Sequence, residues 1–267
     1  MPTNIIVKIN EIEMIGQHIP VIMIHPIEGH INTLKDLAKN LKYPVFGIQY
    51  TRDAMQCKSI SELANFYWKM IQNEFGETRV HLCGYGLGSV VSLEMACQRE
   101  QYCASLTLLD NGIMCRCGHR QSKTTDQIES ESLVKFTKNY VNSIDNEMYN
   151  KLMLSHSVTD RVGLIVNEIM KNSQFIFDED DLTNAACSYV IKSHMLEKYS
   201  PMHRLDLPVV VLIKAMPNLT EIENDLNQVV NGRVEPHVVG CKQQELLVGK
   251  NCMQISGILN ENLIRFA

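Results

Sequence analysis

The chain lacks several features that would place it in a class at once. No window approaches the roughly 18 uncharged apolar residues that a membrane-spanning helix needs, and no run of Lys and Arg forms the basic stripe of a nucleic-acid-binding protein. The start, Met1-Pro2-Thr3-Asn4, has no basic region followed by an apolar stretch, so no signal peptide is expected. These absences predict a cytoplasmic protein with no membrane span and no nucleic-acid partner.

The cysteines also lack a pattern. There are nine, an odd number, and they are scattered without a repeated disulfide spacing, which favours a reducing compartment. Cys115-x-Cys117-x-His119 can be interpreted as half a metal site or as an exposed loop with thiols. Its spacing departs from the usual Cys-x₂₋₄-Cys, and no second Cys/His pair is close in sequence. We therefore expect neither a metal nor a cofactor.

What is present is an alternation of strand and helix signals. With 267 residues, 45% of them hydrophobic, and a net charge of −5, the chain is long enough for one α/β domain with an insertion. Short apolar runs separated by helical periods predict a doubly wound, mostly parallel sheet. The expected strands are residues 4–9, 20–24, 45–48, 80–83, 105–109, 208–213 and 234–239.

Helical periods interrupt the strands over the middle of the chain. Residues 111–132 are polar and are expected to form a loop, and helices are expected to fill residues 132–198, with start signals at Thr159-Asp160 and at 178–181. Another helix is predicted to start at Ser59, with Glu62 completing a capping box, and a final helix over residues 253–266. We therefore expect a single domain, 1–267, with a core of 1–112 and 201–267 and a helical, lid-type insertion at about 130–200. The inserted helices can be interpreted as a lid or acyl-binding subdomain, or as a block that only adds packed bulk.

The most informative stretch is Gly84-Tyr85-Gly86-Leu87-Gly88, which follows a short apolar strand and opens a helix. That is the context of the Gly-x-Ser-x-Gly nucleophile elbow of α/β-hydrolases. The central position carries Gly86 instead of a residue with a hydroxyl. The motif thus predicts an enzyme fold while it argues against the enzyme's chemistry.

Further motifs occur along nearly the whole chain. They are His25-Pro26-Ile27-Glu28-Gly29, Gly47-Ile48-Gln49-Tyr50-Thr51-Arg52, the elbow with Ser92-Leu93-Glu94-Met95 and Gln98, Leu108-Leu109-Asp110-Asn111-Gly112, Asp160-Arg161-Val162, Tyr199-Ser200-Pro201 and Leu246-Leu247-x-Gly249. Together they resemble one family, the thioesterase domain at the end of animal fatty acid synthase. This resemblance implies an α/β-hydrolase fold and hydrolysis of acyl thioesters on acyl carrier protein to free fatty acid. It implies an acyl chain on carrier protein or CoA, and other synthase domains, as partners.

The resemblance also locates the catalytic positions. The nucleophile position is Gly86, the acid position is Asp110, and the histidine position is Gln243. Ile27 and Leu87 are implied as the backbone N–H donors of the oxyanion hole, which side-chain loss leaves intact. No histidine follows His237, which is expected on a strand. His25 is expected to be structural, and we expect no substitute nucleophile from the set Ser89, Cys83, Cys97, Cys103 and Tyr85.

Three hypotheses follow from this pattern. The first is a catalytically impaired homologue that binds an acyl chain, a carrier protein or a partner subunit. The alternative is an active acyl thioester hydrolase of fatty acid biosynthesis that uses an atypical nucleophile or a directly attacking water. The third is a decayed copy with little selected role. Acyl chain length remains open, as does whether the chain belongs to a larger synthase.

Overall fold

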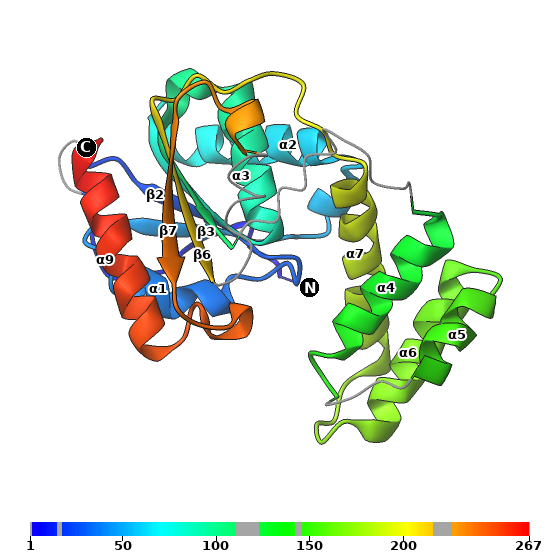
Figure 1. Ribbon diagram of the computed structural model, residues 1–267. Coiled ribbons are helices and arrows are strands. Elements are labelled where there is room, and N and C mark those ends of the chain that lie inside the picture. Colours follow the sequence, from blue (N-terminus) through cyan, green and yellow to red (C-terminus); the bar gives the residue numbers. More distant parts are fainter. Residues whose placement is uncertain (1, 15–17, 111–122, 142–145, 216–225, 267) are drawn as a thin grey trace. The chain divides into compact units, whose positions relative to one another are not determined.

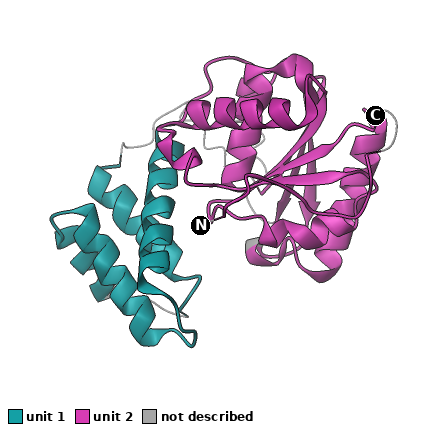
Figure 2. Cartoon of the chain, turned by 180° about the vertical axis from the view of Figure 1, so that it is seen from behind, with its two compact units in different colours: residues 1, 119–198 teal, residues 2–118, 199–267 magenta. Residues whose placement is uncertain are grey.

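The structure is a computed structural model that describes residues 2–14, 18–110, 123–141, 146–215 and 226–266. The chain divides into two compact units, which Figure 2 colours separately. Residues 2–118 and 199–267 form the sheet unit, and residue 1 with residues 119–198 forms the helical unit. Within the described ranges, no helix combines the length and the apolar character that crossing a bilayer requires.

Within the described residues, the sheet has seven strands in the order β1-β3-β2-β4-β5-β6-β7. Among these strands, β1 pairs antiparallel with β3, and the other pairs are parallel. The central strands are continuous apolar runs because helices cover both of their faces. The predicted doubly wound, mostly parallel sheet is therefore confirmed. The strands are β1 (Ile6–Lys8), β2 (Val21–Ile24), β3 (Val45–Ile48), β4 (Val80–Tyr85), β5 (Cys103–Leu109), β6 (Val209–Ala215) and β7 (Arg233–Val239).

Helices pack on both faces of this sheet (Figure 1). Helices α1 and α9 share one apolar cluster with β2 and β6, in which Leu37, Ile255 and Leu259 are buried. Helices α2 and α3 pack against each other and α3 contacts β4 and β5. Helix α3 is buried from Leu87 to Ala96, which fits its lack of a polar stripe. The helices of this unit are α1 (Lys35–Lys39), α2 (Ile60–Phe75), α3 (Leu87–Gln98) and α9 (Gly249–Arg265), with 3-10 turns η1 (Asn32–Leu34), η2 (Ala54–Gln56), η3 (Glu100–Tyr102) and η4 (Gln243–Glu245).

Two helix starts were predicted correctly from local capping signals. The backbone N–H of Glu62 donates to Ser59 Oγ at 3.1 Å, so the cap predicted at Ser59 is confirmed. The Glu62 carboxylate, however, accepts from the N–H of Lys58 at 2.8 Å instead of closing a capping box on Ser59. The cap predicted at 178–181 is also confirmed, because Asp178 accepts from the N–H of Asp181 at 2.9 Å.

Three boundary predictions were wrong. Part of the loop expected over residues 111–132 is helix α4, which begins at Thr125 because Thr124 and Gln127 form a reciprocal capping box. Helix α6 begins at Val158, since Ser157 caps it in place of Thr159. The last helix begins at Gly249, four residues before the apolar period that predicted it. The first turns of α4 and α6 are marked by side-chain caps more than by apolar periodicity, whereas α9 begins after Val248 without a side-chain cap.

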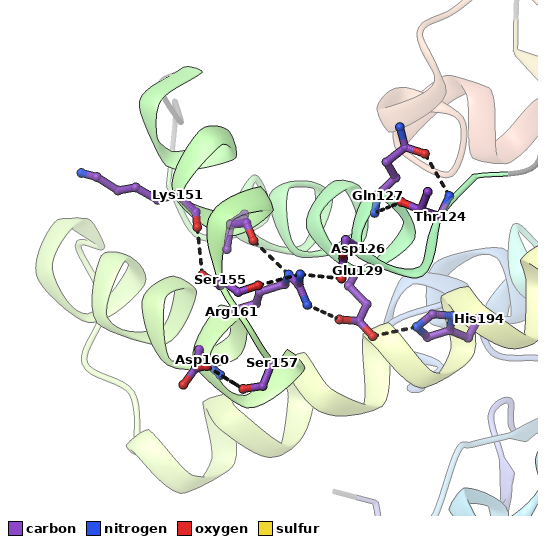
Figure 3. Close-up of polar contacts among 11 residues, drawn as sticks. Thr124, Asp126, Gln127, Glu129, Lys151, Ser155, Ser157, Asp160, Arg161 and His194 are labelled. Carbon is purple, nitrogen blue, oxygen red and sulfur yellow. Dashed lines mark hydrogen bonds and ion pairs between the residues drawn. The ribbon is translucent and has the colours of Figure 1, made fainter.

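In the part that the structure describes, the helical unit consists of helices, and one buried guanidinium links three of them. It contains α4 (Thr125–Thr137), α5 (Asn146–Leu154), α6 (Val158–Asn172) and α7 (Glu179–Glu197). Arg161 of α6 is 3% exposed. It donates to Glu129 at 2.9 Å and Asp126 at 2.6 Å on α4, and to the carbonyls of Leu152 and Ser155, both at 2.9 Å, at the end of α5 (Figure 3). His194 of α7 lies 3.1 Å from the other oxygen of Glu129 (Figure 3).

One buried histidine of the sheet makes stability depend on pH. His81 on β4 is 1% exposed, and its Nδ1 lies 2.8 Å from Ser105 Oγ on β5. Burial, with Arg79 nearby, lowers the pKa of His81 from 6.5 to about 4. Because the folded pKa is the lower one, the stabilisation is complete above the unfolded pKa and is lost as pH falls through the folded value.

We therefore expect the free energy of unfolding to fall by roughly 3 kcal/mol between pH 7 and pH 4 on account of this group, at about 1.4 kcal/mol per pKa unit. Urea unfolding at a series of pH values measures the slope. His81→Asn, which keeps a polar group toward Ser105 but does not titrate, should flatten that part of the profile. An unchanged slope in this variant would refute the assignment to His81.

Candidate active site

The turn between β4 and α3 has the backbone conformation of a nucleophile elbow. Gly86 joins the two elements with φ +58° and ψ −116°. Its N–H donates to the carbonyl of Leu109 at 3.0 Å, and its own carbonyl accepts from the N–H of Ser89 at 3.1 Å. These bonds hold the turn against the end of β5, in a region of backbone space that L-residues enter only with strain.

The three glycines of the elbow differ in what they require. A Cβ on Gly84 would lie 2.1 Å from the carbonyl oxygen of Gly88, and one on Gly88 would lie 2.4 Å from that of Ile24. Both positions therefore need glycine so that α3 can pack against β4 and β2. A Cβ on Gly86 would meet no heavy atom of the described residues within 4 Å beyond its chain neighbours. The middle position has room for a side chain and carries none.

Asp110 lies directly beside this turn. It follows Leu109, whose carbonyl accepts from Gly86, and its own N–H donates to the carbonyl of Ile213 at 2.8 Å. Its side chain is 6% exposed, and its φ of +47° is the only positive value found for a non-glycine residue in the described ranges. A buried carboxylate in a strained backbone conformation at the end of a strand is a common feature of functional sites. The structure thus brings the predicted nucleophile and acid positions together.

Two further polar groups share the electrostatic environment of Asp110. Burial, and next the Asp110 carboxylate, raise the pKa of Tyr85 to about 12, with smaller contributions from Glu28 and Cys241. Burial, Glu245 and Asp110 together raise the pKa of the Cys241 thiol. Cys241 is not among the site residues that the sequence motifs predict. Its position in the loop after the last strand, two residues before Gln243, was the available signal.

The predicted histidine position lies in that same loop. Gln243 is the first residue of η4, and its side chain lies outside the described part of the chain. The sequence from 238 to 267 contains no histidine. His237 belongs to β7, as expected. A general base from this loop would therefore have to be something other than imidazole.

His25 is held on both sides of its ring. It is completely buried, with Nδ1 2.6 Å from the carbonyl oxygen of Pro26 and Nε2 2.6 Å from the hydroxyl of Tyr67. Because a carbonyl only accepts, Nδ1 donates to it, and Tyr67 then donates to Nε2. Burial raises the pKa of Tyr67 well above its usual value, and Tyr50 and Cys57 add to that effect. These contacts give His25 a structural role between β2 and α2.

The two backbone donors predicted for an oxyanion hole lie at adjacent turns. Leu87 is the first residue of α3, where a helix offers its N–H group no intrahelical acceptor. Ile27 belongs to the turn after β2, which is closed by the bond from Gly29 N–H to Pro26 oxygen at 3.0 Å. Strand β2 pairs with β4 up to Ile24 and Gly84, so both turns follow neighbouring strand ends. Ile27 and Leu87 therefore lie on adjacent turns at the carboxyl ends of β2 and β4.

The other candidate nucleophiles are engaged or disfavoured. Ser89 is completely buried, and its hydroxyl lies within hydrogen-bond distance of the carbonyl oxygens of Gly84, at 2.6 Å, and Leu109, at 2.9 Å. Burial raises the pKa of Cys83 and, together with Glu94, that of Cys97 to about 12 each. Cys103 is buried too, and burial raises its pKa strongly. Thiolate, the reactive form, is therefore scarce at these positions.

Metal ligands do not gather in the described ranges, where no group of three or more His, Cys, Asp or Glu side chains is placed to hold an ion. Cys115 and Cys117, with His119, lie outside those ranges, so the two interpretations of that motif stay open.

Known proteins resemble this chain in sequence over part of its length and in fold. The family model described as Thioesterase domain matches residues 19–143. Among solved structures, a four-domain nonribosomal peptide synthetase bound to AMP and glycine superposes with a TM-score of 0.74 at 16% identity, over 96% of this chain and 20% of its own. The present chain thus spans about a fifth of that protein's length.

Two further thioesterase structures match over nearly their whole length. The type II thioesterase BorB from the borrelidin biosynthetic cluster has a TM-score of 0.63 at 15% identity, and 97% of each chain is covered. The Vlm2 thioesterase domain with 2,3-diaminopropionic acid, bound with a dodecadepsipeptide, has a TM-score of 0.63 at 14% identity, over 97% of this chain and 98% of its own. This chain therefore has the predicted α/β-hydrolase fold, and its residues 19–143 match the thioesterase-domain family.

Proposed function

We propose that this protein binds acyl thioesters at the elbow between β4 and α3 and hydrolyses them poorly. The observation that carries the proposal is Gly86, which keeps the φ of +58° of a nucleophile turn and has room for a side chain but supplies no attacking oxygen. Gln243, assigned to the histidine position, cannot take up a proton as an imidazole does. Acid, turn and backbone donors remain, so a carbonyl can be held while the covalent step is lost.

Magnitudes support an impaired enzyme over a working one. Removal of a triad serine or histidine costs about 10⁶-fold in turnover, which is roughly 8 kcal/mol of barrier. Binding and an oxyanion hole alone retain about 10³–10⁴-fold over water. Glycine also relieves the strain of the turn, which is about 1–3 kcal/mol for a residue with a side chain. A chain released from catalysis gains stability through Gly86.

The acyl group would arrive on a carrier protein or on CoA. The resemblance of the motifs to the fatty acid synthase thioesterase also suggests a role beside the other domains of such a synthase. Support for carrier-linked substrates comes from the Thioesterase domain match. A cytoplasmic location goes with this proposal, because the cysteines in the described ranges are free thiols. The helical unit, residues 119–198, is the part proposed as the lid-type insertion.

The proposal is tested with palmitoyl-CoA and a fluorophosphonate probe. Isothermal titration should detect palmitoyl-CoA binding that free CoA does not reproduce, and thiol release should stay near the buffer rate. A fluorophosphonate should leave the protein unlabelled, because Gly86 supplies no hydroxyl at the elbow. Turnover that follows the protein through purification would establish the alternative, an active hydrolase with an atypical nucleophile. Stable folding without any acyl binding would favour the decayed copy.

A further inference from the structure

The helical unit exposes two large apolar side chains at the turn between α6 and α7. Phe175 is 70% exposed and Ile176 is fully exposed, at 101% of its reference area. They are neighbours in sequence, and they lie between Ser173, which ends α6, and Asp178, which caps α7. Adjacent exposed side chains of this size are candidates for a protein contact.

Hydrogen bonds hold the turn that carries these two side chains. The N–H of Ser173 donates to the carbonyl of Ile169 at 2.8 Å, and the N–H of Phe175 donates to Ser173 Oγ at 3.1 Å. On the far side, Asp178 accepts from the N–H of Asp181 at 2.9 Å. Both ends of the turn are therefore fixed by hydrogen bonds.

Aromatic contacts tie the same turn to the interior of the helical unit. The ring centroids of Phe175 and Phe177 are 6.3 Å apart, and Phe177 meets Tyr140 edge-on at 5.2 Å. Tyr140 lies 5.0 Å from Phe136, which is 3% exposed. A turn supported in this way loses little freedom when a partner covers it, which reduces the entropic cost of association.

Carboxylates follow the apolar pair along the chain. Asp178, Glu179, Asp180 and Asp181 follow in sequence and are exposed, and Lys171 is the cation at the end of α6. The cap of α7 uses Asp178. The others leave negative charge on the α7 side of the pair, which the same turn of a second copy or an anionic membrane surface would meet with repulsion. Complementary charge and burial of the two side chains both call for a basic, apolar partner.

We propose that this surface, the acidic turn formed by residues 173–181, docks a protein segment whose apolar side chains are flanked by Lys or Arg. Phe175 and Ile176 enter the apolar part of the partner, and Glu179 and Asp180 pair with its cations. Such an arrangement has the central apolar anchor and charged rim of protein interfaces. The proposal goes beyond acyl binding at the elbow and does not depend on it.

The test uses the full chain and a defined probe, a fluorescein-labelled helical peptide of alternating Leu and Lys residues. Fluorescence anisotropy should show binding at low salt that weakens as salt rises. Phe175→Ser with Ile176→Ser should weaken it at least tenfold. Glu179→Lys with Asp180→Lys, which spares the Asp178 cap, should also weaken it at least tenfold and remove the salt dependence. Leu154→Ser is the matched control, since Leu154 is 79% exposed in the same unit, and it should bind as the parent does.

Three results would overturn the proposal. The first is equal binding by the Phe175→Ser, Ile176→Ser variant and the parent. The second is equally tight binding of a Leu/Glu peptide, which would remove the charge argument. The third is capture of the chain by phosphatidylcholine vesicles, or concentration-dependent self-association in ultracentrifugation, that the same double variant abolishes. Those outcomes would assign the turn to a lipid surface or to a second copy.

Discussion

Gly86→Ser combined with Gln243→His is expected to raise the hydrolysis of palmitoyl-CoA at least 10³-fold over the parent protein, within the roughly 10⁶-fold range that a serine and histidine control together. The residues of a triad act as a unit, so either single change should give almost nothing. The turn already holds the required φ of +58°, and a Cβ there meets no heavy atom of the described residues within 4 Å beyond its neighbours. Asp110, next to the turn, is the carboxylate that we propose to orient an introduced imidazole.

The measurement is thiol release from palmitoyl-CoA, accompanied by fluorophosphonate labelling. Gly86→Ala with Gln243→His is the control, because it adds a Cβ and the same backbone strain, about 1–3 kcal/mol, without a hydroxyl. Only the serine variant should be labelled. If the double variant folds but gains neither turnover nor labelling, position 243 is not where the histidine of this site belongs. A parent rate already within tenfold of the double variant would contradict the impaired function itself.

Arg161→Ala is expected to cost about 3–5 kcal/mol of stability in the helical unit, because it leaves a buried carboxylate without its cation. Glu129 is 9% exposed at the side chain and accepts from Arg161 at 2.9 Å, whereas Asp126 is 55% exposed and can turn to water. Two carbonyls at the end of α5 lose their donor as well. The change therefore loosens α4, α5 and α6 together (Figure 3).

Urea unfolding followed by circular dichroism measures this loss, and hydrogen exchange in α4–α6 locates it. Lys151→Ala removes an exposed pair with Glu147 on α5 and should change stability by less than about 0.5 kcal/mol. Replacing the buried pair as a whole, with Arg161→Met and Glu129→Met, should recover much of the loss, because no unpaired charge stays inside. A loss in Arg161→Ala no larger than that of Lys151→Ala would show that the buried network contributes nothing.

Several properties of the protein follow from local sequence. Apolar runs such as Val21–Ile24 and Val80–Tyr85 predict buried parallel strands because burial on both faces removes the polar alternation. Caps such as Ser59 and Asp178 involve residues three apart, so spacing alone reveals them. The sequence also shows directly that position 86 at the elbow is glycine and that no histidine follows His237.

Other properties depend on contacts between residues far apart in the chain. Arg161 donates to Glu129, 32 positions away, and Tyr199 donates to Glu94, 105 positions away, at 2.9 Å. The motifs that contain these residues therefore do not reveal their partners from sequence alone. Cys241 follows β7 and Asp110 follows β5, and the two strands are separated in the sheet only by β6. This strand order brings the Cys241 thiol within the electrostatic influence of Asp110. Local patterns could not predict these neighbours.

The sequence by itself determined the parallel sheet, the elbow and the loss of its hydroxyl, because each of these is written in the type and spacing of nearby residues. Only the tertiary structure decided that Gly84 and Gly88 are required by close packing while Gly86 has room, and that Asp110 holds a φ of +47° beside it. The physical reason is that steric fit and backbone strain arise where separate elements meet, and their distance is not encoded in any short stretch of the chain.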